Sequence, residues 1–401
     1  MSRRPILVVT PSFRGGSWRR TEEAIRRASS GSSASGQETK NLVCHCVGYG
    51  PWSTTDTSEE VLPAPHRVIR IPFGEYSRWH FLVQMPILSA FTSLPLACVS
   101  YVWGFYLRPR AVFANGLVAA FWLLPLVWIL RARLLVAHHG WVADVKGPAA
   151  WLTRRLGRHL EKVFVNSRGS ADDLSRLVPR DRLVILEHNP APAFFVEREP
   201  FEQWETFDLS ARPTLLFVSR LDPEKNVDLL IPVLESMLQS KDSGEDRPLF
   251  LIGGDGEMKA DVQALAQRFP EDVVYLGYIE SQETLARLYR TADLFWGCGT
   301  ATYLELPAVE ALVAGTPILI PDRTSILGAR RHGQNRVDPD LVPEAQGRLV
   351  KADTADLGQA LIEMLHKVKH GDYNRDEIRD EACRRYGLHN LEPMLDALRA
   401  L

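Results

Sequence analysis

The chain has 401 residues, of which 45% are hydrophobic and 24% charged, and this balance suits a globular protein with two large α/β domains. Its formal net charge of −2 provides no overall field that would favour nucleic acid as a partner. The five cysteines are scattered and form no CxxC pair, so we interpret them as reduced thiols and expect no metal site. The apolar stretch Ile6–Val9 is too short for a signal peptide, and we therefore expect a cytoplasmic protein.

The chain begins with a pattern of strand, glycine-rich turn and helix. Ile6–Val9 is apolar and β-branched, Gly15 and Gly16 follow it, and a helical pattern runs from Trp18 to Ala28. Further short strands are predicted at Leu42–Val47, Arg67–Ile71, Ala111–Phe113, Leu134–Ala137, Val163–Val165 and Leu183–Leu186. Strands that alternate with helices predict a largely parallel sheet covered on both faces.

Two stretches of this half, Phe81–Leu107 and Leu117–Leu130, are unusually apolar. The second is too short to cross a bilayer comfortably, and Pro86, Pro95 and Gly104 interrupt the first. One interpretation is a pair of buried helices in a doubly wound domain. The other is an apolar surface that rests on a membrane or receives a lipid acceptor. The basic residues that follow fit either a solvated helix face or a contact with anionic headgroups; they are Arg154, Arg155, Arg158 and Lys162.

A proline-rich stretch separates this half from a second α/β series. The second series has strand candidates at Thr214–Val218, Leu249–Ile252, Val273–Leu276, Leu294–Trp296 and Pro317–Ile320. The predicted fold class is therefore α/β, with two Rossmann-like doubly wound domains that face a cleft. The expected domains are an N-terminal Rossmann-like domain at 1–190, a linker at 191–212, a C-terminal Rossmann-like domain at 213–385 and a C-terminal helix at 386–401 that packs back toward the N-terminal domain.

The strongest chemical signal is a pair of cations after the first strand of the second series. Arg220 and Lys225 lie between Val218 and an amphipathic helix, so both are expected at the carboxyl edge of the sheet. Open α/β sheets bind ligands at that edge, and two cations beside a helix N-terminus suit a diphosphate. An exposed loop with ordinary surface charges is the alternative.

Two further signals follow in chain order. Glycines at Gly253, Gly254 and Gly256 directly follow a strand and permit a close backbone approach, although they lack the spacing of a dinucleotide fingerprint. The carboxylate of Glu310 lies in an apolar helix and needs a partner, for which sugar hydroxyls or helix amides would serve. Gly315 ends that helix.

These segments together resemble the family 4 retaining glycosyltransferases of GT-B fold. The resemblance rests on the order of Arg220…Lys225, Gly254-Asp255-Gly256, Tyr275–Ile279 and Glu310-Ala311-Leu312…Gly315-Thr316-Pro317. The N-terminal half fits more loosely, with Gly15-Gly16, His138-His139-Gly140, Val165-Asn166-Ser167 and Asn189-Pro190.

The resemblance implies a role for each matching residue. Arg220 and Lys225 would bind the donor diphosphate, and Glu310 would accept hydrogen bonds from the ribose. The backbone of Gly277, Tyr278 and Ile279 would hold the base, and Gly15 and Gly16 would bring amides to the phosphates. His139 would lie near the sugar, a role that His138 could fill instead; a strand-end histidine without any such role is the alternative for both. The resemblance also implies that 213–385 is the nucleotide-sugar-binding domain and 1–190 the acceptor-binding domain. The donor would be a nucleotide-diphosphate sugar, with no cofactor or metal required.

One position departs from the family pattern. The family carries a second glutamate at the position that Thr302 occupies, and that glutamate is expected to touch the donor sugar. Thr302 offers a hydrogen bond but no charge, and Glu305 is nearby at the wrong spacing. Ser219 and Asn226 also stand where glycine is common in the family, and both are small enough for the loop.

Three functions are compatible with these observations. The first is a retaining, hexosyltransferase-like enzyme whose acceptor hydroxyl belongs to a lipid or a lipid-linked glycan, in peripheral contact with the cytoplasmic face of a membrane. The second is a sugar-nucleotide epimerase of the same fold, and the third is a non-catalytic nucleotide-sugar binder or complex subunit, which Thr302 motivates. Nucleotide release that depends on an acceptor distinguishes the first from the second, and donor binding without transfer indicates the third.

Overall fold

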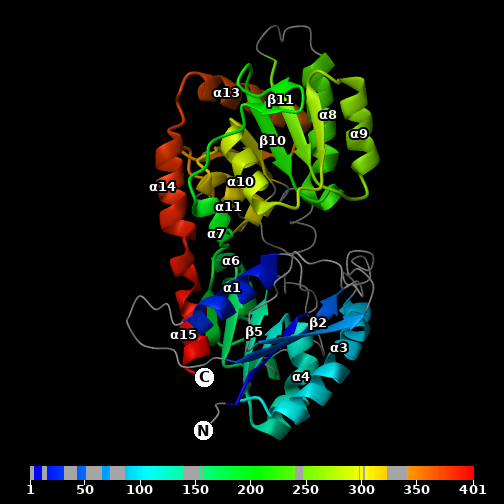
Figure 1. The fold of residues 1–401 in the computed structure, drawn as a ribbon, viewed down its shortest axis with the longest axis vertical. Helices are drawn as coiled ribbons and strands as arrows, with labels where there is room; N and C mark the ends of the chain where they lie inside the picture. Colours follow the sequence, from blue (N-terminus) through cyan, green and yellow to red (C-terminus); the bar gives the residue numbers. More distant parts are fainter. Residues whose placement is uncertain are drawn as a thin grey trace. The chain divides into compact units, whose positions relative to one another are not determined.

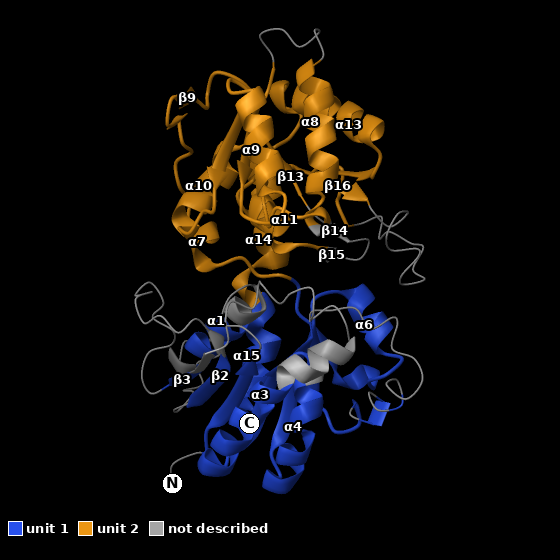
Figure 2. Ribbon diagram, turned by 90° about the vertical axis from the view of Figure 1, so that its right-hand side faces the viewer, with its two compact units in different colours: residues 1–187, 390–401 blue, residues 188–389 orange. Residues whose placement is uncertain are grey.

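The structure is a computed structural model of the whole chain (Figure 1). It describes residues 4–10, 16–30, 43–50, 66–72, 86–138, 151, 154–155, 157–239, 247–297, 299–300, 303–322 and 341–401. The chain divides into two compact units (Figure 2). Unit 1 contains residues 1–187 and 390–401, and unit 2 contains residues 188–389.

Unit 1 is built on a parallel sheet with the strand order β3-β2-β1-β4-β5-β6-β7. Its strands are β1 (Ile6–Thr10), β2 (Cys44–Gly50), β3 (Arg67–Pro72), β4 (Ala111–Asn115), β5 (Arg133–His138), β6 (Lys162–Val165) and β7 (Leu183–Ile185). The central strands β1 and β4 are buried along their whole length, as expected for a sheet covered on both faces.

Two helices of unit 1, α3 and α4, come from the two apolar stretches of the sequence. The helices are α1 (Gly16–Ser30), α3 (Pro86–Leu107), α4 (Leu117–Leu130), α6 (Arg168–Leu174) and α15 (Glu392–Arg399). Helices α3 and α4 pack against each other and share a core with Leu7, Val112 and Val136 of the sheet. Helix α15 packs against α1, and the Arg133 guanidinium donates to the Ala400 carbonyl at 2.8 Å. Among the described residues, no helix meets the length and apolarity that crossing a membrane requires.

Unit 2 repeats the same topology with the strand order β12-β11-β10-β13-β16-β17, all parallel. These strands are β10 (Thr214–Val218), β11 (Leu249–Gly253), β12 (Val273–Gly277), β13 (Leu294–Trp296), β16 (Ile318–Asp322) and β17 (Gly347–Lys351). Alternate residues of β10 enter opposite cores: Leu216 packs with Phe295 on one face, and Leu215 and Phe217 pack on the other.

Helices cover both faces of this second sheet. They are α7 (Pro192–Phe195), α8 (Val227–Gln239), α9 (Lys259–Arg268), α10 (Gln282–Thr291), α11 (Leu306–Val313), α13 (Thr354–Lys369) and α14 (Arg375–Tyr386). Short 3₁₀ turns and two small hairpins complete the described elements: η2 (Arg180–Arg182), η3 (Pro223–Lys225), η5 (Leu388–Leu391), β8 (Gln203–Trp204) with β9 (Phe207–Asp208), and β14 (Gly299–Thr300) with β15 (Tyr303–Leu304).

Each sheet reverses its strand order once, between β1 and β4 in unit 1 and between β10 and β13 in unit 2. This is the doubly wound arrangement, in which ligands bind beyond the carboxyl ends of the strands at the point of reversal. The prediction of two Rossmann-like domains is therefore confirmed. In unit 2, the loop that leaves this point is the one that carries Arg220 and Lys225.

Candidate functional site

The loop after β10 has a defined local structure. The Asp222 carboxylate caps the short turn η3 by accepting a hydrogen bond from the Lys225 amide at 3.1 Å. Asn226 then adopts φ 66°, in the left-handed region that asparagine tolerates better than most residues. This explains how asparagine can replace the glycine that the family often has here. The amino end of α8 follows directly.

Backbone hydrogen bonds join this loop to those after β11 and β12. The Leu221 amide donates to the Asp255 carbonyl at 3.0 Å, and the Gly254 amide donates to the Gly277 carbonyl at 2.7 Å. Gly254 has φ +137°, and a Cβ there would lie 1.9 Å from the Ser219 carbonyl oxygen. Only glycine allows these loops to approach so closely, so Gly254 holds the loops together.

Three cations in the described loops after β10 and β11 are each paired with a carboxylate. Arg220 lies 2.9 Å from Asp222, and Lys225 lies 2.5 Å from Glu305. The third cation, Lys259 at the start of α9, lies 3.6 Å from Asp255. Three positive and three negative side chains thus balance locally. Arginine has five N–H donors and lysine three, so each cation can also donate to a ligand.

The Lys225–Glu305 pair joins two parts of the site that are 80 residues apart in the chain. Glu305 is the N-cap residue of α11, but its side chain makes no hydrogen bond to that helix. Both side chains are mostly buried, with 19% and 18% exposed. Sequence reasoning set Glu305 aside because of its spacing to Glu310, and no local signal indicated its contact with Lys225. The contact exists because β10 and the segment before α11 end at the same edge of the sheet.

The predicted base-binding backbone follows β12. Gly277 adopts φ +70° and lies in the strand-to-loop turn. The Tyr278 side chain is exposed, whereas that of Ile279 packs over Gly253, where a Cβ would lie 3.0 Å from the Ile279 Cδ1. The backbone of this turn therefore lies beside the loop after β11.

Glu310 is buried inside α11, with only 4% of its surface exposed. Its carboxylate accepts a hydrogen bond from the Tyr289 hydroxyl at 3.2 Å. Tyr289 belongs to α10 and packs in the core against Phe295. The buried carboxylate thus has a hydrogen-bond donor within the protein. The expected donors were sugar hydroxyls or helix amides, and the observed one is a tyrosine hydroxyl.

Three of the predicted site residues lie outside the described residues: Gly15, His139 and Thr302. Gly16 is the first residue of α1, which follows β1 at the point of strand reversal in unit 1. Within that region the Thr21 hydroxyl of α1 donates to the Asn115 side-chain oxygen at the end of β4, at 3.3 Å. His138 is the last residue of β5.

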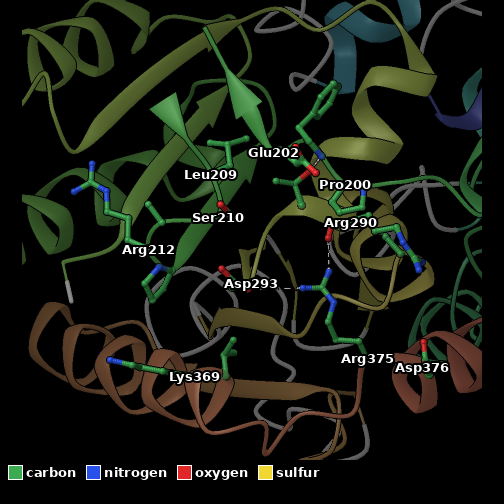
Figure 3. Close-up of a pocket in the computed structure, with 16 residues that line it drawn as sticks. Pro200, Glu202, Leu209, Ser210, Arg212, Arg290, Asp293, Lys369, Arg375 and Asp376 are labelled. Atoms are coloured by element: carbon green, nitrogen blue, oxygen red, sulfur yellow. Dashed lines mark hydrogen bonds and ion pairs between the residues drawn. The ribbon is translucent and has the colours of Figure 1, made fainter. Parts of the chain in front are cut away.

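A cavity of about 850 Å³ lies at the other end of the strands of unit 2 (Figure 3). One of the lining residues is Arg375, which lies 4.0 Å from Asp293 and donates to the carbonyls of Arg290 and Ala292. Burial raises the pKa of Asp293 and lowers that of Arg375. Asp293 also accepts a hydrogen bond from the Thr214 amide at the start of β10. We therefore interpret these groups as structural contacts that join strands to helices. None of the predicted donor residues lines this cavity.

Within the described part of the chain, no group of three or more histidine, cysteine, aspartate or glutamate side chains could hold a metal ion. The charges at the carboxyl edge are instead organised as separate pairs. Their chemistry suits an anionic ligand that carries several oxygen acceptors.

Comparisons with known proteins agree with this geometry. A family model described as "Glycosyl transferases group 1" matches residues 212–367. The chain is 31% identical over 144 residues to the GDP-mannose-dependent alpha-(1-6)-phosphatidylinositol dimannoside mannosyltransferase of Mycobacterium tuberculosis, covering 35% of this chain and 36% of the relative. It is 30% identical over 227 residues to the D-inositol 3-phosphate glycosyltransferase of Nocardia farcinica, covering 55% of this chain and 43% of the relative. The matches thus span about two fifths of these relatives' lengths.

Solved structures match along almost the whole chain. Sucrose-phosphate synthase from Thermosynechococcus elongatus has a TM-score of 0.68 at 15% identity, covering 99% of this chain and 97% of that protein. HepE of Anabaena, solved in complex with UDP-glucose, has a TM-score of 0.65 at 14% identity, covering 99% and 100%. The GT-B fold is therefore confirmed, and the match of residues 212–367 to the glycosyl transferases group 1 model confirms the prediction of a glycosyltransferase at the level of this domain.

Proposed function

We propose that this protein is a retaining glycosyltransferase that moves a sugar from a nucleotide-diphosphate sugar to the hydroxyl of a lipid or lipid-linked acceptor. The observation that carries the proposal is the position of Arg220 and Lys225, at the carboxyl edge of β10 where the strand order reverses. That is the place where a doubly wound sheet binds an anionic ligand, and it lies inside the matched domain.

Each loop binds a different part of the donor. Arg220 and Lys225 donate to the diphosphate, and each charge-assisted contact contributes about 1.5–3 kcal/mol. The backbone of Gly277, Tyr278 and Ile279 holds the base, and Glu310 accepts from the ribose hydroxyls. Gly254 keeps the loops close enough for these contacts.

Three residues outside the described part of the chain complete the proposal, together with the first residue of α1. Gly15 and Gly16 bring backbone amides to the phosphates, and His139 lies near the sugar. Thr302 has a hydroxyl where the family has a carboxylate, so donor preference is expected to depend on this position.

In the proposed reaction, the acceptor hydroxyl attacks the anomeric carbon on the face from which the diphosphate leaves. The bond from that carbon to the diphosphate oxygen breaks, and the departing oxygen takes the proton of the hydroxyl. Negative charge grows on the diphosphate as it leaves, and Arg220 and Lys225 stabilise that charge. The protein otherwise contributes by positioning.

The names of two similar proteins support a nucleotide-sugar donor and a lipid acceptor. The Mycobacterium relative is named for GDP-mannose and for a phosphatidylinositol dimannoside, and the Anabaena protein was solved with UDP-glucose. We place the reaction at the cytoplasmic face of a membrane, because unit 1 carries long apolar helices near basic residues.

The test is a thermal-shift screen against nucleoside diphosphates and their sugars, repeated with Arg220→Ala. A ligand present at about a hundred times its dissociation constant stabilises the fold by about 2.7 kcal/mol. We expect one base to raise the midpoint and the variant to lose the shift. No shift with any member of the panel would contradict the proposal.

A non-catalytic nucleotide-sugar binder is the second candidate. It is favoured by the pairing of both donor-site cations with carboxylates and by the missing charge at Thr302. Tight donor binding without transfer to any acceptor, including lipid extracts, would support it over the first.

A further inference from the structure

Helices α3 and α4 of unit 1 contain no charged residue, and the described side chains of both include exposed apolar ones. Helix α4 reads LVAAFWLLPLVWIL and contains no polar side chain, although it lies at the surface of the unit. A helix that is apolar on all sides is normally enclosed by protein or lipid. Here one side packs into the core through Leu123, Leu126 and Val127, while Trp128 and Ile129 are 56% and 63% exposed.

Helix α3 shows the same pattern over a greater length. Leu94, Cys98 and Val102 are exposed and follow one another at intervals of four residues, so they form a stripe along one face. Tyr106 continues the stripe with 76% of its surface exposed, and Phe105 lies beside it. Leu96 and Ser100, on the opposite side, are buried.

The two helices lie next to each other (Figure 1). Gly104 of α3 packs directly on Leu126 of α4, where a Cβ would lie 2.6 Å from a Leu126 methyl group. The Tyr101 hydroxyl also donates to the Trp122 carbonyl at 2.9 Å. Because both helices return antiparallel to the strands, the residues that follow these contacts lie at the same level. We name the combined surface the α3/α4 surface, formed by Leu94, Cys98, Val102, Phe105, Tyr106, Trp128 and Ile129.

Within residues 86–133, every charged side chain has the same sign. Residues 86–133 contain four arginines and no aspartate, glutamate or lysine. Arg108 and Arg131 directly follow the two helices and are exposed. The ring of Trp128 packs edge-on against His159 with centroids 5.1 Å apart, and the exposed Arg158 precedes that histidine. Apolar and aromatic side chains bordered by arginines match the boundary between acyl chains and anionic headgroups.

A second copy of the chain fits this surface less well. In a symmetric dimer, each partner would present the same patch, so arginines would face arginines with no carboxylate in residues 86–133 to pair with them. An anionic bilayer offers an apolar region to the aromatic side chains and anionic headgroups to the arginines.

We propose that the α3/α4 surface docks the protein on an anionic membrane, with both helices lying in the interface. Trp128, Ile129, Val102 and Tyr106 enter the boundary of the acyl chains, while Arg108 and Arg131 contact phosphate groups. The functional role of docking, which is to bring a lipid acceptor to the enzyme, rests on the proposed function. The binding of the protein to vesicles does not depend on that function.

The first experiment sediments the full chain with vesicles of phosphatidylcholine alone and with phosphatidylglycerol added. We expect binding only to the anionic vesicles, and weaker binding as salt rises. Ile129→Ser combined with Trp128→Ser should lower the partition coefficient by about tenfold or more. Arg108→Gln and Arg131→Gln should each lower it about fivefold, as expected from about 1 kcal/mol for each arginine near such a surface.

The matched control is Ile362→Ser in α13 of unit 2, since Ile362 is 53% exposed but lies in an amphipathic helix. Its binding should equal that of the parent. Equal binding of the α3/α4 variants and the parent would overturn the proposal, as would a parent that stays in the supernatant. A parent that forms dimers which Ile129→Ser dissolves would identify a second copy as the occupant instead.

The exposed thiol of Cys98 provides an independent readout. In a variant in which Cys298 and Cys383 are serine, anionic vesicles should protect Cys98 from a water-soluble maleimide, while Cys44 and Cys46 are already buried. Unchanged labelling in the presence of bound vesicles would show that another surface makes the contact. Donor binding, measured by thermal shift without lipid, should be the same in all these variants. A parent that binds the donor but no vesicles would therefore contradict this inference alone, whereas a parent that binds vesicles but no donor would contradict only the proposed function.

Discussion

The two units share one topology but differ in what their helices present to the outside. Helix α4 of unit 1 has no polar residue and exposes Trp128 and Ile129. Helix α10 of unit 2 buries Ala286, Leu288 and Tyr289 and is polar or charged at most other positions. The same doubly wound sheet therefore supports two surface chemistries. Unit 2 concentrates charge pairs on its loops, whereas unit 1 concentrates apolar area on its helices, which suggests a polar ligand for the first and a lipid surface for the second.

The largest expected effect separates these two roles. Arg220→Ala should lower kcat/KM by about 100-fold or more, on the scale of one lost contact to the charge that develops in the transition state. The loss should be equal with detergent-solubilised and vesicle-bound acceptor. The control is Arg268→Ala, because Arg268 is similarly exposed and paired with Glu235 on the same unit. Near-normal turnover in Arg220→Ala would remove this residue from the donor site.

The next effect distinguishes the two faces of α4. Leu126→Ala removes a fully buried side chain that packs on Gly104 and should reduce the free energy of unfolding by about 2–5 kcal/mol. Ile129→Ser, only three residues away, should change it by less than about 0.5 kcal/mol, as is usual for exposed positions. Urea denaturation of both variants measures the difference. A large loss for Ile129→Ser would mean that protein covers this face.

A smaller effect concerns the charge balance of the donor site. Glu305→Gln removes the carboxylate paired with Lys225 and should tighten nucleoside-diphosphate binding by about fivefold to tenfold, on the scale of a partly exposed charge pair. Calorimetric titration measures the dissociation constant, with Glu283→Gln as an exposed control on the same unit. Weaker binding would instead indicate that Glu305 mainly positions the Lys225 ammonium.

The smallest effect is a pH dependence in unit 1. Burial lowers the pKa of both His45 and His66, and the His66 ring accepts the Cys44 amide at 3.1 Å. A lowered pKa in the folded state means that stability is present above the unfolded pKa of about 6.5 and is lost as pH falls through the folded pKa. Unit 1 should therefore be cleaved by protease more readily at pH 5.5 than at pH 7.5, after correction for protease activity. His66→Gln should reduce this difference.

Much of the fold could be predicted from local patterns. Each strand predicted from an apolar run, from Ile6–Val9 to Pro317–Ile320, is a strand whose ends lie within three residues of the predicted ones. The edge strand β17 (Gly347–Lys351) was missed because only two of its five residues are buried, so it gives no continuous apolar signal. The apolar stretches at α3 and α4 were open to two interpretations, and the structure supports elements of both: each helix has a buried side and an exposed apolar side.

The sequence by itself determined the alternation of strands and helices, the loop that carries Arg220 and Lys225, and the glycines that follow β11, because each depends on residues close together in the chain. Only the tertiary structure decided which distant groups meet. Strand order brings Glu305 to Lys225, helix packing brings Tyr289 to Glu310, and the contact of Gly104 with Leu126 sets two apolar helix faces side by side. These contacts join residues from 21 to 80 positions apart, and hydrophobic periodicity carries no information on pairing over such separations.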